Sequence, residues 1–236
     1  MKIILNTSTF FCEAKTFVTI GTFDGVHFGH QKIIERVVSE AKIAQKKSVA
    51  LTFFPHPRMV LQKDSSVKLI NTIDERSALL EKTGLDYLII HPFSKEFSRM
   101  TALEFVKDIL VNQLNISKLI IGYDHHFGKN REGNINQLTE YSDLYDFKLT
   151  EIPAQDIDEV FVSSTKIRNA LNAGDLKTAN HYLRYFFMLS GTVVNGEKLG
   201  GKIGYPTANI HIEETYKLIP KNGVYVVRSY FENNAV

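Results

Sequence analysis

The chain has 236 residues, of which 44% are hydrophobic and 23% charged, and its formal net charge is +2. This composition is typical of a globular protein with a sizeable core, and the near balance of charge argues against a nucleic-acid partner. No apolar run is long enough for a membrane span, and the first residues lack the apolar core of a signal peptide. Because the single cysteine, Cys12, cannot form an intramolecular disulfide, we expect a soluble, cytoplasmic protein.

The first predicted strand covers residues 16–20, which are β-branched, aromatic and alternating. A helix is predicted from Gln31, with its apolar stripe on Ile33, Ile34, Val37, Val38 and Ala41. Between them lies the sequence Gly-Thr-Phe-Asp-Gly-Val-His-Phe-Gly-His, residues 21–30. A turn that leads into a helix N-terminus favours anions, because its backbone N–H groups and the helix dipole face the ligand. Gly29 removes the side chain between His27 and His30, so a phosphate can approach the backbone while both imidazoles donate to it.

Strands and helices alternate along the chain as far as residue 153. The mostly apolar stretches that predict further strands are 48–54, 86–91, 118–122 and 147–153. Thr72 to Glu75 and Thr101 to Glu104 are capping boxes, which open helices that end near Gly84 and Leu114. Another helix is predicted over 136–145.

This alternation predicts an α/β fold, a doubly wound parallel sheet of Rossmann type with helices on both faces. Ligands of such sheets bind outside the carboxyl ends of the strands, near a switch in strand order. The loops after the strands 16–20, 48–54 and 118–122 all leave carboxyl ends. We therefore expect these loops to converge on one site.

The character of the chain changes in its last quarter. A helix is predicted from Ser163 to Gly174, and Asp175 is expected to cap the next helix. Strand-like segments follow at 191–194 and 224–231, with a glycine-rich run between them that ends at Gly204. We place a domain boundary near Phe187, which gives a first domain over 1–187 and a second over 188–236.

The helix start at Ser163-Ser164-Thr165-Lys166-Ile167-Arg168 is the second candidate phosphate site. Hydroxyls and free N–H groups gather there, and Arg168 adds a planar fork that matches phosphate geometry. Taken alone, the stretch is more often an ordinary N-cap with a solvated arginine. Its position after the fifth predicted strand favours the phosphate site.

Four stretches resemble motifs of one family. The block 21–30 resembles the N-terminal signature of the bacterial bifunctional riboflavin kinase/FMN adenylyltransferases (FAD synthetases), and more broadly the His-x-Gly-His loop of the nucleotidyltransferase superfamily. Residues 163–168 resemble the family motif Ser-Ser-Thr-x-Ile-Arg. Residues 52–57 resemble Thr-Phe-x-Pro-His-Pro, and residues 122–129 resemble Gly-x-Asp-x-x-Phe-Gly-Lys. All four occur in family order at predicted strand ends.

The resemblance implies adenylyl transfer, in which FMN and ATP give FAD and pyrophosphate by in-line attack on the α-phosphorus. It implies catalytic roles for His27, His30 and Arg168, with Mg²⁺ bound to ATP and held largely by substrate oxygens and water. The implied ATP-binding residues are Gly21, Thr22, Phe23, Asp24, Gly29, Asp124, Ser164 and Thr165. The implied flavin-binding residues are Phe54, Pro55, His56 and Phe127. Phe54 fits either a core position or a ring that faces the flavin.

Residues 201–209 resemble the riboflavin kinase motif Gly-Arg/Lys-x-x-Gly-Phe/Tyr-Pro-Thr-Ala-Asn. This resemblance implies that Lys202, Thr207 and Asn209 contact the nucleotide, that Thr207 and Asn209 also meet Mg²⁺, and that riboflavin is a substrate. Residues 196–202 nearly spell a Walker A loop, but Ile203 replaces the Ser or Thr that binds Mg²⁺, and no helix pattern follows. We reject that alternative.

The second domain departs from the family in two ways. The family usually has Leu-Gly-Arg-Pro-Tyr near the junction, where this chain has Leu-Arg-Tyr-Phe-Phe at 183–187. The family's kinase domain is a six-stranded β-barrel, and residues 188–236 correspond to its first third. We therefore expect an incomplete barrel, with riboflavin kinase activity only in a longer form of the protein.

Two alternatives to this assignment remain open, and a third interpretation, a zinc site, is rejected. A sister adenylyltransferase with another phosphate ester as substrate would lack the Pro-Thr-Ala-Asn stretch. A non-catalytic flavin- or nucleotide-binding module would have no need for charge donors such as His27, His30 and Arg168. A zinc site at His125-His126 has no carboxylate or cysteine at ligand spacing.

Overall fold

A six-stranded parallel sheet forms the centre of the first domain. The computed structural model describes residues 1–61, 67–123, 126–129, 132–153, 162–197, 199–231 and 234–235. Its strands are β1 (Lys2–Ile4), β2 (Thr16–Ile20), β3 (Lys47–Phe54), β4 (Tyr87–Pro92), β5 (Ile116–Gly122) and β6 (Lys148–Ile152). They lie in the order β1-β4-β3-β2-β5-β6, and every adjacent pair is parallel. The order changes direction at β2, so the loop after β2 leaves the sheet at its switch point.

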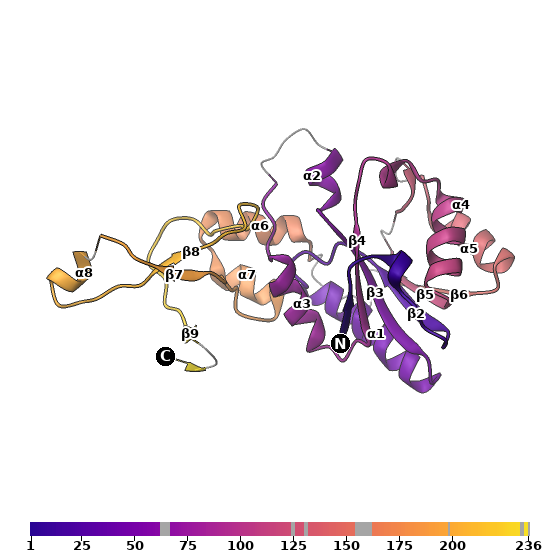
Figure 1. Ribbon diagram of the computed structural model, residues 1–236, viewed down its shortest axis with the longest axis horizontal. Helices are drawn as coiled ribbons and strands as arrows, with labels where there is room; N and C mark the ends of the chain where they lie inside the picture. The colour runs from indigo at the N-terminus through magenta and orange to yellow at the C-terminus, as the bar shows by residue number, and fades with distance from the viewer. Residues whose placement is uncertain are drawn as a thin grey trace.

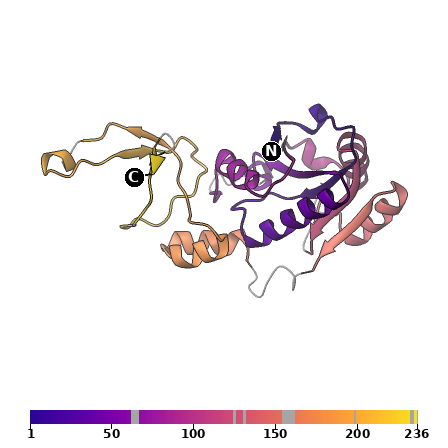
Figure 2. The ribbon, with the colours of Figure 1, turned by 90° about the horizontal axis from the view of Figure 1, so that it is seen from below.

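Helices cover both faces of this sheet (Figures 1 and 2). The helices on one face are α1 (Phe28–Ile43) and α3 (Ile73–Glu81), and those on the other are α4 (Ala102–Glu104), the following π-helix (Phe105–Gln113) and α5 (Ile135–Leu144). The alternation of β3 shows the two layers: Ala50 packs in one core cluster with Ile34 of α1, and Leu51 packs in another with Leu110 of the π-helix. The predicted doubly wound α/β fold is confirmed.

Local helix signals are confirmed at several termini. Thr72 accepts from the N–H of Glu75 at 3.1 Å, and Glu75 accepts from the N–H of Thr72 at 3.0 Å, so the capping box is complete. The box of Thr101 and Glu104 is complete as well. Gly174 ends its helix at φ 81°, a left-handed conformation that glycine adopts without steric cost.

Two elements near the N-terminus differ from the prediction. The edge strand β1 was not expected, because three half-exposed residues carry too short a pattern to signal a strand. Helix α1 begins at Phe28, three residues earlier than predicted, with His27 as its N-cap residue. The histidines therefore lie on the first turn of the helix. The other short elements before α6 are η1 (Thr7–Thr9), α2 (Pro57–Leu61) and η2 (Phe97–Arg99).

The C-terminal part begins with α6 (Ser164–Ala173) and α7 (Leu176–Leu183) and continues as an arm that extends away from the sheet (Figure 1). The arm holds β7 (Thr192–Val194), α8 (Leu199–Lys202), β8 (Asn209–His211), β9 (Tyr230–Phe231) and β10 (Asn234–Ala235). Strands β7 and β8 pair antiparallel, as do β9 and β10. The prediction of a strand over 224–231 is wrong for residues 224–229. Val224 and Val226 are fully exposed, and within the described chain no strand pairs with this stretch.

One piece of the arm returns to the first domain. Residues 214–218, which we call the docking segment, form a parallel bridge with Leu69. Leu69 donates to the carbonyl of Tyr216 at 2.7 Å and accepts from the N–H of Leu218 at 2.7 Å. Lys217 is buried and forms an ion pair with Glu75 of α3. The docking segment thus covers the same stretch, 69–76, that contacts the loop after β2.

Candidate active site

The loop between β2 and α1 makes a sharp turn below the two histidines. Phe23, Gly25 and Val26 have positive φ values of 47°, 87° and 36°. At Gly25 a side chain would be strained, and its Cβ would lie 2.9 Å from the Cδ1 atom of Ile70. Phe23 is buried in a core cluster, so the loop is fixed from below. This turn delivers the N-terminus of α1 to the carboxyl end of the central strand.

His27 and His30 stack on each other with ring centroids 3.6 Å apart and an interplanar angle of 20°. His27 is the N-cap residue of α1, but its side chain makes no cap hydrogen bond. The Nδ1 atoms of both rings are buried, and neither has a hydrogen-bond partner among the described residues. Both imidazoles are therefore available to a ligand at the helix N-terminus.

Burial holds both histidines in the neutral form. It lowers the pKa of His27 to about 4, against the opposing effect of the Asp24 charge. It also lowers the pKa of His30 well below the usual 6.5, and the charges of His27 and Arg76 act in the same direction. At neutral pH each ring therefore carries one N–H donor and one acceptor nitrogen.

Asp24 joins the loop to two other parts of the chain. Its Oδ1 accepts from the backbone N–H groups of Ile70 at 2.9 Å and Asn71 at 3.3 Å. Its Oδ2 accepts from Nη2 of Arg168 at 2.6 Å, and its backbone carbonyl accepts from the Ser164 hydroxyl at 2.9 Å. The Asp24 side chain is fully buried. The structure thus places this predicted ATP-binding residue beneath the site, where it orients other residues.

Arg168 lies on α6 beside the predicted phosphate helix start. Its Nε donates to the carbonyl of Lys68 at 3.0 Å, and its side chain is 15% exposed. Ser163 caps the helix by accepting from the N–H of Lys166 at 3.3 Å. Thr165, in the first turn, is exposed. The structure therefore brings Arg168, Ser164 and the histidine loop together through Asp24.

The loop after β3 forms another wall of the site. Thr52 donates to the carbonyl of Thr22 at 3.2 Å, and Gly21 donates to the carbonyl of Leu51 at 3.1 Å, so the two loops are tied together. His56 is buried, and its Nδ1 accepts from the backbone N–H of Arg58 at 3.1 Å. Burial lowers the pKa of His56 to about 4, and the nearby Asp24 charge opposes that shift.

Phe54 and Phe127 occupy different surroundings. The Phe54 ring is half-buried and lies 5.4 Å from the Tyr216 ring of the docking segment, with Pro55 exposed beside it. Phe127 is mostly buried in the main core cluster, 5.8 Å from the ring of Phe105. Phe54 thus packs against a core cluster while part of its ring stays exposed beside the site, whereas Phe127 is buried in the core. Asp124 lies outside the described residues.

Sequence reasoning missed Arg76. This arginine of α3 is fully buried, and its Nη2 lies 3.8 Å from Oδ1 of Asp24. It shares a helix face with Leu79 and Leu80, so a charged residue on an apolar stripe was the signal that could have identified it. Tyr185 was missed as well; its hydroxyl donates to the carbonyl of Gly25 at 2.6 Å.

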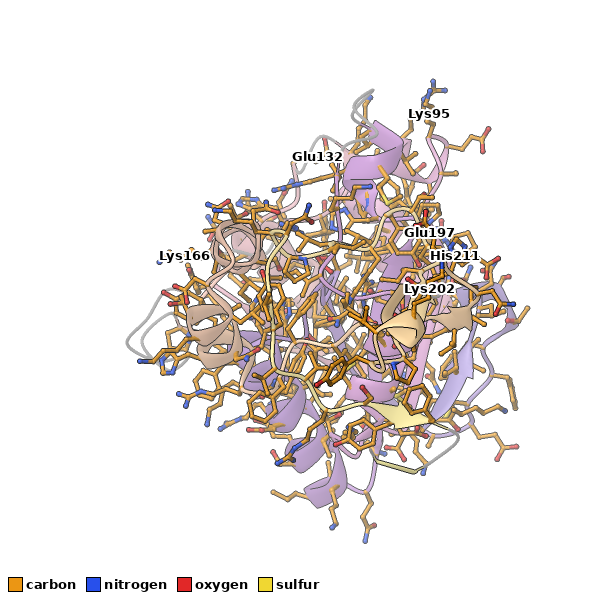
Figure 3. The ribbon with its side chains drawn as sticks, turned by 90° about the vertical axis from the view of Figure 1, so that its left-hand side faces the viewer. Lys95, Glu132, Lys166, Glu197, Lys202 and His211 are labelled. Carbon is orange, nitrogen blue, oxygen red and sulfur yellow. The ribbon has the colours of Figure 1, made fainter. Side chains whose placement is uncertain are left out.

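The predicted kinase residues Lys202, Thr207 and Asn209 are all exposed on the arm. A side chain at Gly196 would collide with Asn209, and one at Gly200 would collide with the backbone of Tyr205 and approach Thr207. Figure 3 shows Lys202 on the arm with Glu197 and His211, apart from Lys166 of α6. The described residues hold no cluster of three or more His, Cys, Asp or Glu that would bind a metal by itself. An exposed hydroxyl and amide fit a Mg²⁺ ion that arrives with its nucleotide.

The strand order, the switch-point loop and the paired histidines define an α/β nucleotidyltransferase. Residues 11–166 match the family model of FAD synthetase, and residues 183–236 match that of riboflavin kinase. The chain therefore belongs to the bifunctional riboflavin kinase/FMN adenylyltransferase family.

Curated relatives agree with this assignment. The bifunctional riboflavin kinase/FMN adenylyltransferase of Listeria monocytogenes is 37% identical over 89% of this chain and 67% of its own length. The protein of the same name from Buchnera aphidicola subsp. Schizaphis graminum is 38% identical over 92% of this chain and 69% of its own length. The chain thus spans about two thirds of the length of these relatives.

A solved structure supports the fold. A Streptococcus pneumoniae protein described as a macrolide-efflux protein superposes with a TM-score of 0.88 at 28% identity, over 99% of this chain and 76% of the other. In the described part of the present chain, no helix has the length and apolar character needed to cross a bilayer.

Proposed function

We propose that adenylyl transfer from ATP to FMN takes place where the β2–α1 loop meets α6. The observation that carries this proposal is the pair of stacked, neutral histidines at the N-terminus of α1 (centroids 3.6 Å apart), whose buried nitrogens have no partner in the described chain. Neutral imidazoles donate to phosphate oxygens without forming a permanent ion pair with them. His27 and His30 would stabilise the charge that develops on the α-phosphate as the bonds exchange.

The triphosphate is proposed to lie against α6. Ser164 and Thr165 present hydroxyls and N–H groups at the helix start, and Arg168 adds a guanidinium. Asp24 would act as a positioning residue, because its buried carboxylate fixes the Arg168 side chain at 2.6 Å. Mg²⁺ enters as part of the substrate MgATP. Gly21, Thr22, Phe23 and Gly29 would supply the close backbone approach that the phosphates need.

The flavin is proposed to lie beside the β3 loop. Phe54 offers a half-exposed ring, and Pro55 and His56 line the same turn. The oxygen of the FMN phosphate would attack the α-phosphorus of ATP while the bond to the pyrophosphate oxygen breaks, so no covalent enzyme intermediate is required. Positioning and charge stabilisation would supply the catalysis. Flavin contacts of Phe127 and nucleotide contacts of Asp124 stay predictions.

Riboflavin phosphorylation, the other activity for which these relatives are named, is proposed for a longer form of the protein, and the match of residues 183–236 to the riboflavin kinase model favours it. Lys202, Thr207 and Asn209 would contact the nucleotide, with Thr207 and Asn209 also near Mg²⁺. The boundary near Phe187 and a cytoplasmic location also stay proposals, the latter supported by the unpaired Cys12.

Product analysis tests the adenylyl-transfer proposal. The purified chain incubated with FMN, ATP and Mg²⁺ should form FAD and pyrophosphate in equal amounts, and omission of Mg²⁺ should stop the reaction. FAD is separated from FMN by chromatography, and pyrophosphate is measured by a coupled assay. Binding of both substrates with no FAD would support only a non-catalytic binding module. Adenylylation of another phosphate ester in place of FMN would support a sister nucleotidyltransferase.

A further inference from the structure

Buried hydrogen-bond donors without acceptors gather around the histidine loop. Nε, Nη1 and Nη2 of Arg76 and Nδ2 of Asn71 are buried and have no hydrogen-bond partner in the described part of the chain. Most buried polar groups in proteins are paired, because an unpaired donor costs free energy. Asn71 and Arg76 both contact Asp24, Asn71 through its backbone N–H at 3.3 Å and Arg76 through its charge at 3.8 Å, so they belong to one neighbourhood. Their donors are complementary to an anion.

Asp24 lies between two arginines. Its Oδ2 accepts from Arg168 at 2.6 Å, whereas its Oδ1 is 3.8 Å from Nη2 of Arg76, which is a charge contact without a hydrogen bond. Asp24 therefore compensates the charge of Arg76 while leaving its donors free. A guanidinium held in this way keeps its planar fork for a second anion.

The two arginines face different halves of the proposed site. Arg168 belongs to α6 with Ser164, on the side proposed for the triphosphate. The charges of both arginines act on His56 in the β3 loop, but that of Arg76 also acts on Tyr216, whose ring lies 5.4 Å from that of Phe54. Arg76 therefore lies on the flavin side. In-line transfer needs the attacking and leaving groups on opposite sides of the reacting phosphorus, so the FMN phosphate needs an anchor apart from that of the triphosphate.

We propose that Arg76, assisted by the Asn71 amide, binds the phosphate group of FMN and aims its oxygen at the α-phosphorus of ATP. This inference rests on the proposed adenylyl transfer and adds a binding residue for the attacking substrate. Arg76 does not bind the triphosphate, which is proposed to bind at α6. The flavin ring system itself is recognised elsewhere, at the β3 loop.

Arg76→Met tests the proposal by steady-state kinetics. The KM for FMN should rise by roughly 10- to 100-fold, the loss expected for hydrogen bonds to a charged group, while the KM for ATP stays unchanged. Lumiflavin, which has the ring system but no phosphate, should inhibit both proteins with the same Ki. Arg76→Lys keeps the charge but loses the fork, so its KM for FMN should lie between the two. Arg36→Met, on the exposed side of α1, is the control and should behave as wild type.

A second measurement separates binding from turnover. FMN should raise the melting temperature of the wild type more than lumiflavin does at saturation, and Arg76→Met should lose this difference. Any contribution of a second flavin site is the same in both proteins and cancels. Equal changes in the KM for ATP, or a parallel rise in the Ki of lumiflavin, would show that Arg76 is structural and overturn the proposal. A wild type that makes no FAD refutes the proposed function, and the ligand-dependent melting difference still decides the role of Arg76.

Discussion

The protonation state of the buried histidines at the site affects two properties, their hydrogen bonding to a ligand and the free energy of unfolding. His27 and His56 have pKa values lowered to about 4 by burial, and burial also lowers the pKa of His30 well below its usual 6.5. A neutral ring is therefore the resting form of each across the physiological range. The same burial leaves the Nδ1 atoms of His27 and His30 without a partner in the part of the chain that the structure describes.

His30→Ala should lower kcat by about 100- to 1,000-fold, by analogy with the removal of one donor from an oxyanion hole. The KM for FMN should change little, because the ring acts on charge that develops in the transition state. His181→Ala, at an exposed position of α7, is the matched control and should keep full activity. An unchanged kcat in the His30 variant would remove this residue from the mechanism.

The free energy of unfolding should fall as the pH drops from about 6.5 towards 4. In that window the unfolded chain binds protons on histidines whose pKa values burial lowers in the folded state, to about 4 for His27 and His56, so low pH favours unfolding. Each such histidine contributes a slope of up to about 1.4 kcal/mol per pH unit. Urea titrations at pH 7.5, 6 and 5 measure it. His56→Gln should reduce the slope, and equal stability at pH 7.5 and 5 would contradict the assignment.

At the scale of elements, α3 is the helix that connects the two parts of the chain. Its capping-box residue Glu75 accepts from Nζ of Lys217 and from the N–H of Ser190, the latter at 3.0 Å. The next residue, Arg76, lies against Asp24 of the histidine loop. One turn of helix therefore contacts the docking segment through one residue and the proposed site through the next.

Lys217→Met should destabilise the protein by about 3–5 kcal/mol, because it leaves the buried Glu75 carboxylate without its cation. The double variant Lys217→Met/Glu75→Gln should recover much of this loss, since glutamine preserves the capping box without a charge. Chemical denaturation of the two single variants and the double variant gives the coupling energy. If the losses in unfolding free energy of the two single variants summed to that of the double variant, the ion pair would contribute nothing to stability.

The sequence predicted those elements whose signals are local. Both capping boxes and the left-handed Gly174 were found because they depend on residues within four positions. The ion pair of Lys217 with Glu75 spans 142 positions and leaves no local trace. Residues 224–229 carry a strand-like pattern, but a strand forms only where a neighbour pairs with it. The histidine loop and the β3 loop were expected to meet because strand ends converge, whereas the role of Arg76 depends on the buried face of α3 in the folded chain.

At the scale of the whole molecule, a well-packed sheet domain carries an arm with little core of its own. Val193, Ile203, Tyr205, Val224 and Val226 are all exposed. Among the arm residues whose burial the structure describes, only Lys217 and Leu218 of the docking segment are buried, Leu218 at 2% exposure. The arm therefore depends on a few contacts for its order, and the sheet does not depend on the arm's strands.

Hydrogen exchange should resolve this contrast. Amides of β2, β3 and β5 should exchange slowly, and those of residues 222–229 should exchange at nearly the rate of an unfolded peptide. Leu218 should be protected between fast neighbours, because its N–H donates to the carbonyl of Leu69 at 2.7 Å. Lys217→Met should speed exchange at Leu218 more than at β3, because the N–H of Leu218 depends on the docking segment directly. Uniform protection along the arm would show packing beyond the contacts described.

The carboxylate of Asp24 has a consequence for the order in which the protein is made. It is translated early, but its partners are the amides 46 and 47 positions later and a guanidinium 144 positions later. On the ribosome, the loop that carries the histidines is therefore synthesised early, but its contacts with the rest of the site form late. While α6 is still inside the exit tunnel, the nascent chain can form the sheet but not the assembled site. We therefore expect a pulse-labelled chain to acquire ATP affinity only after residue 168 has left the tunnel.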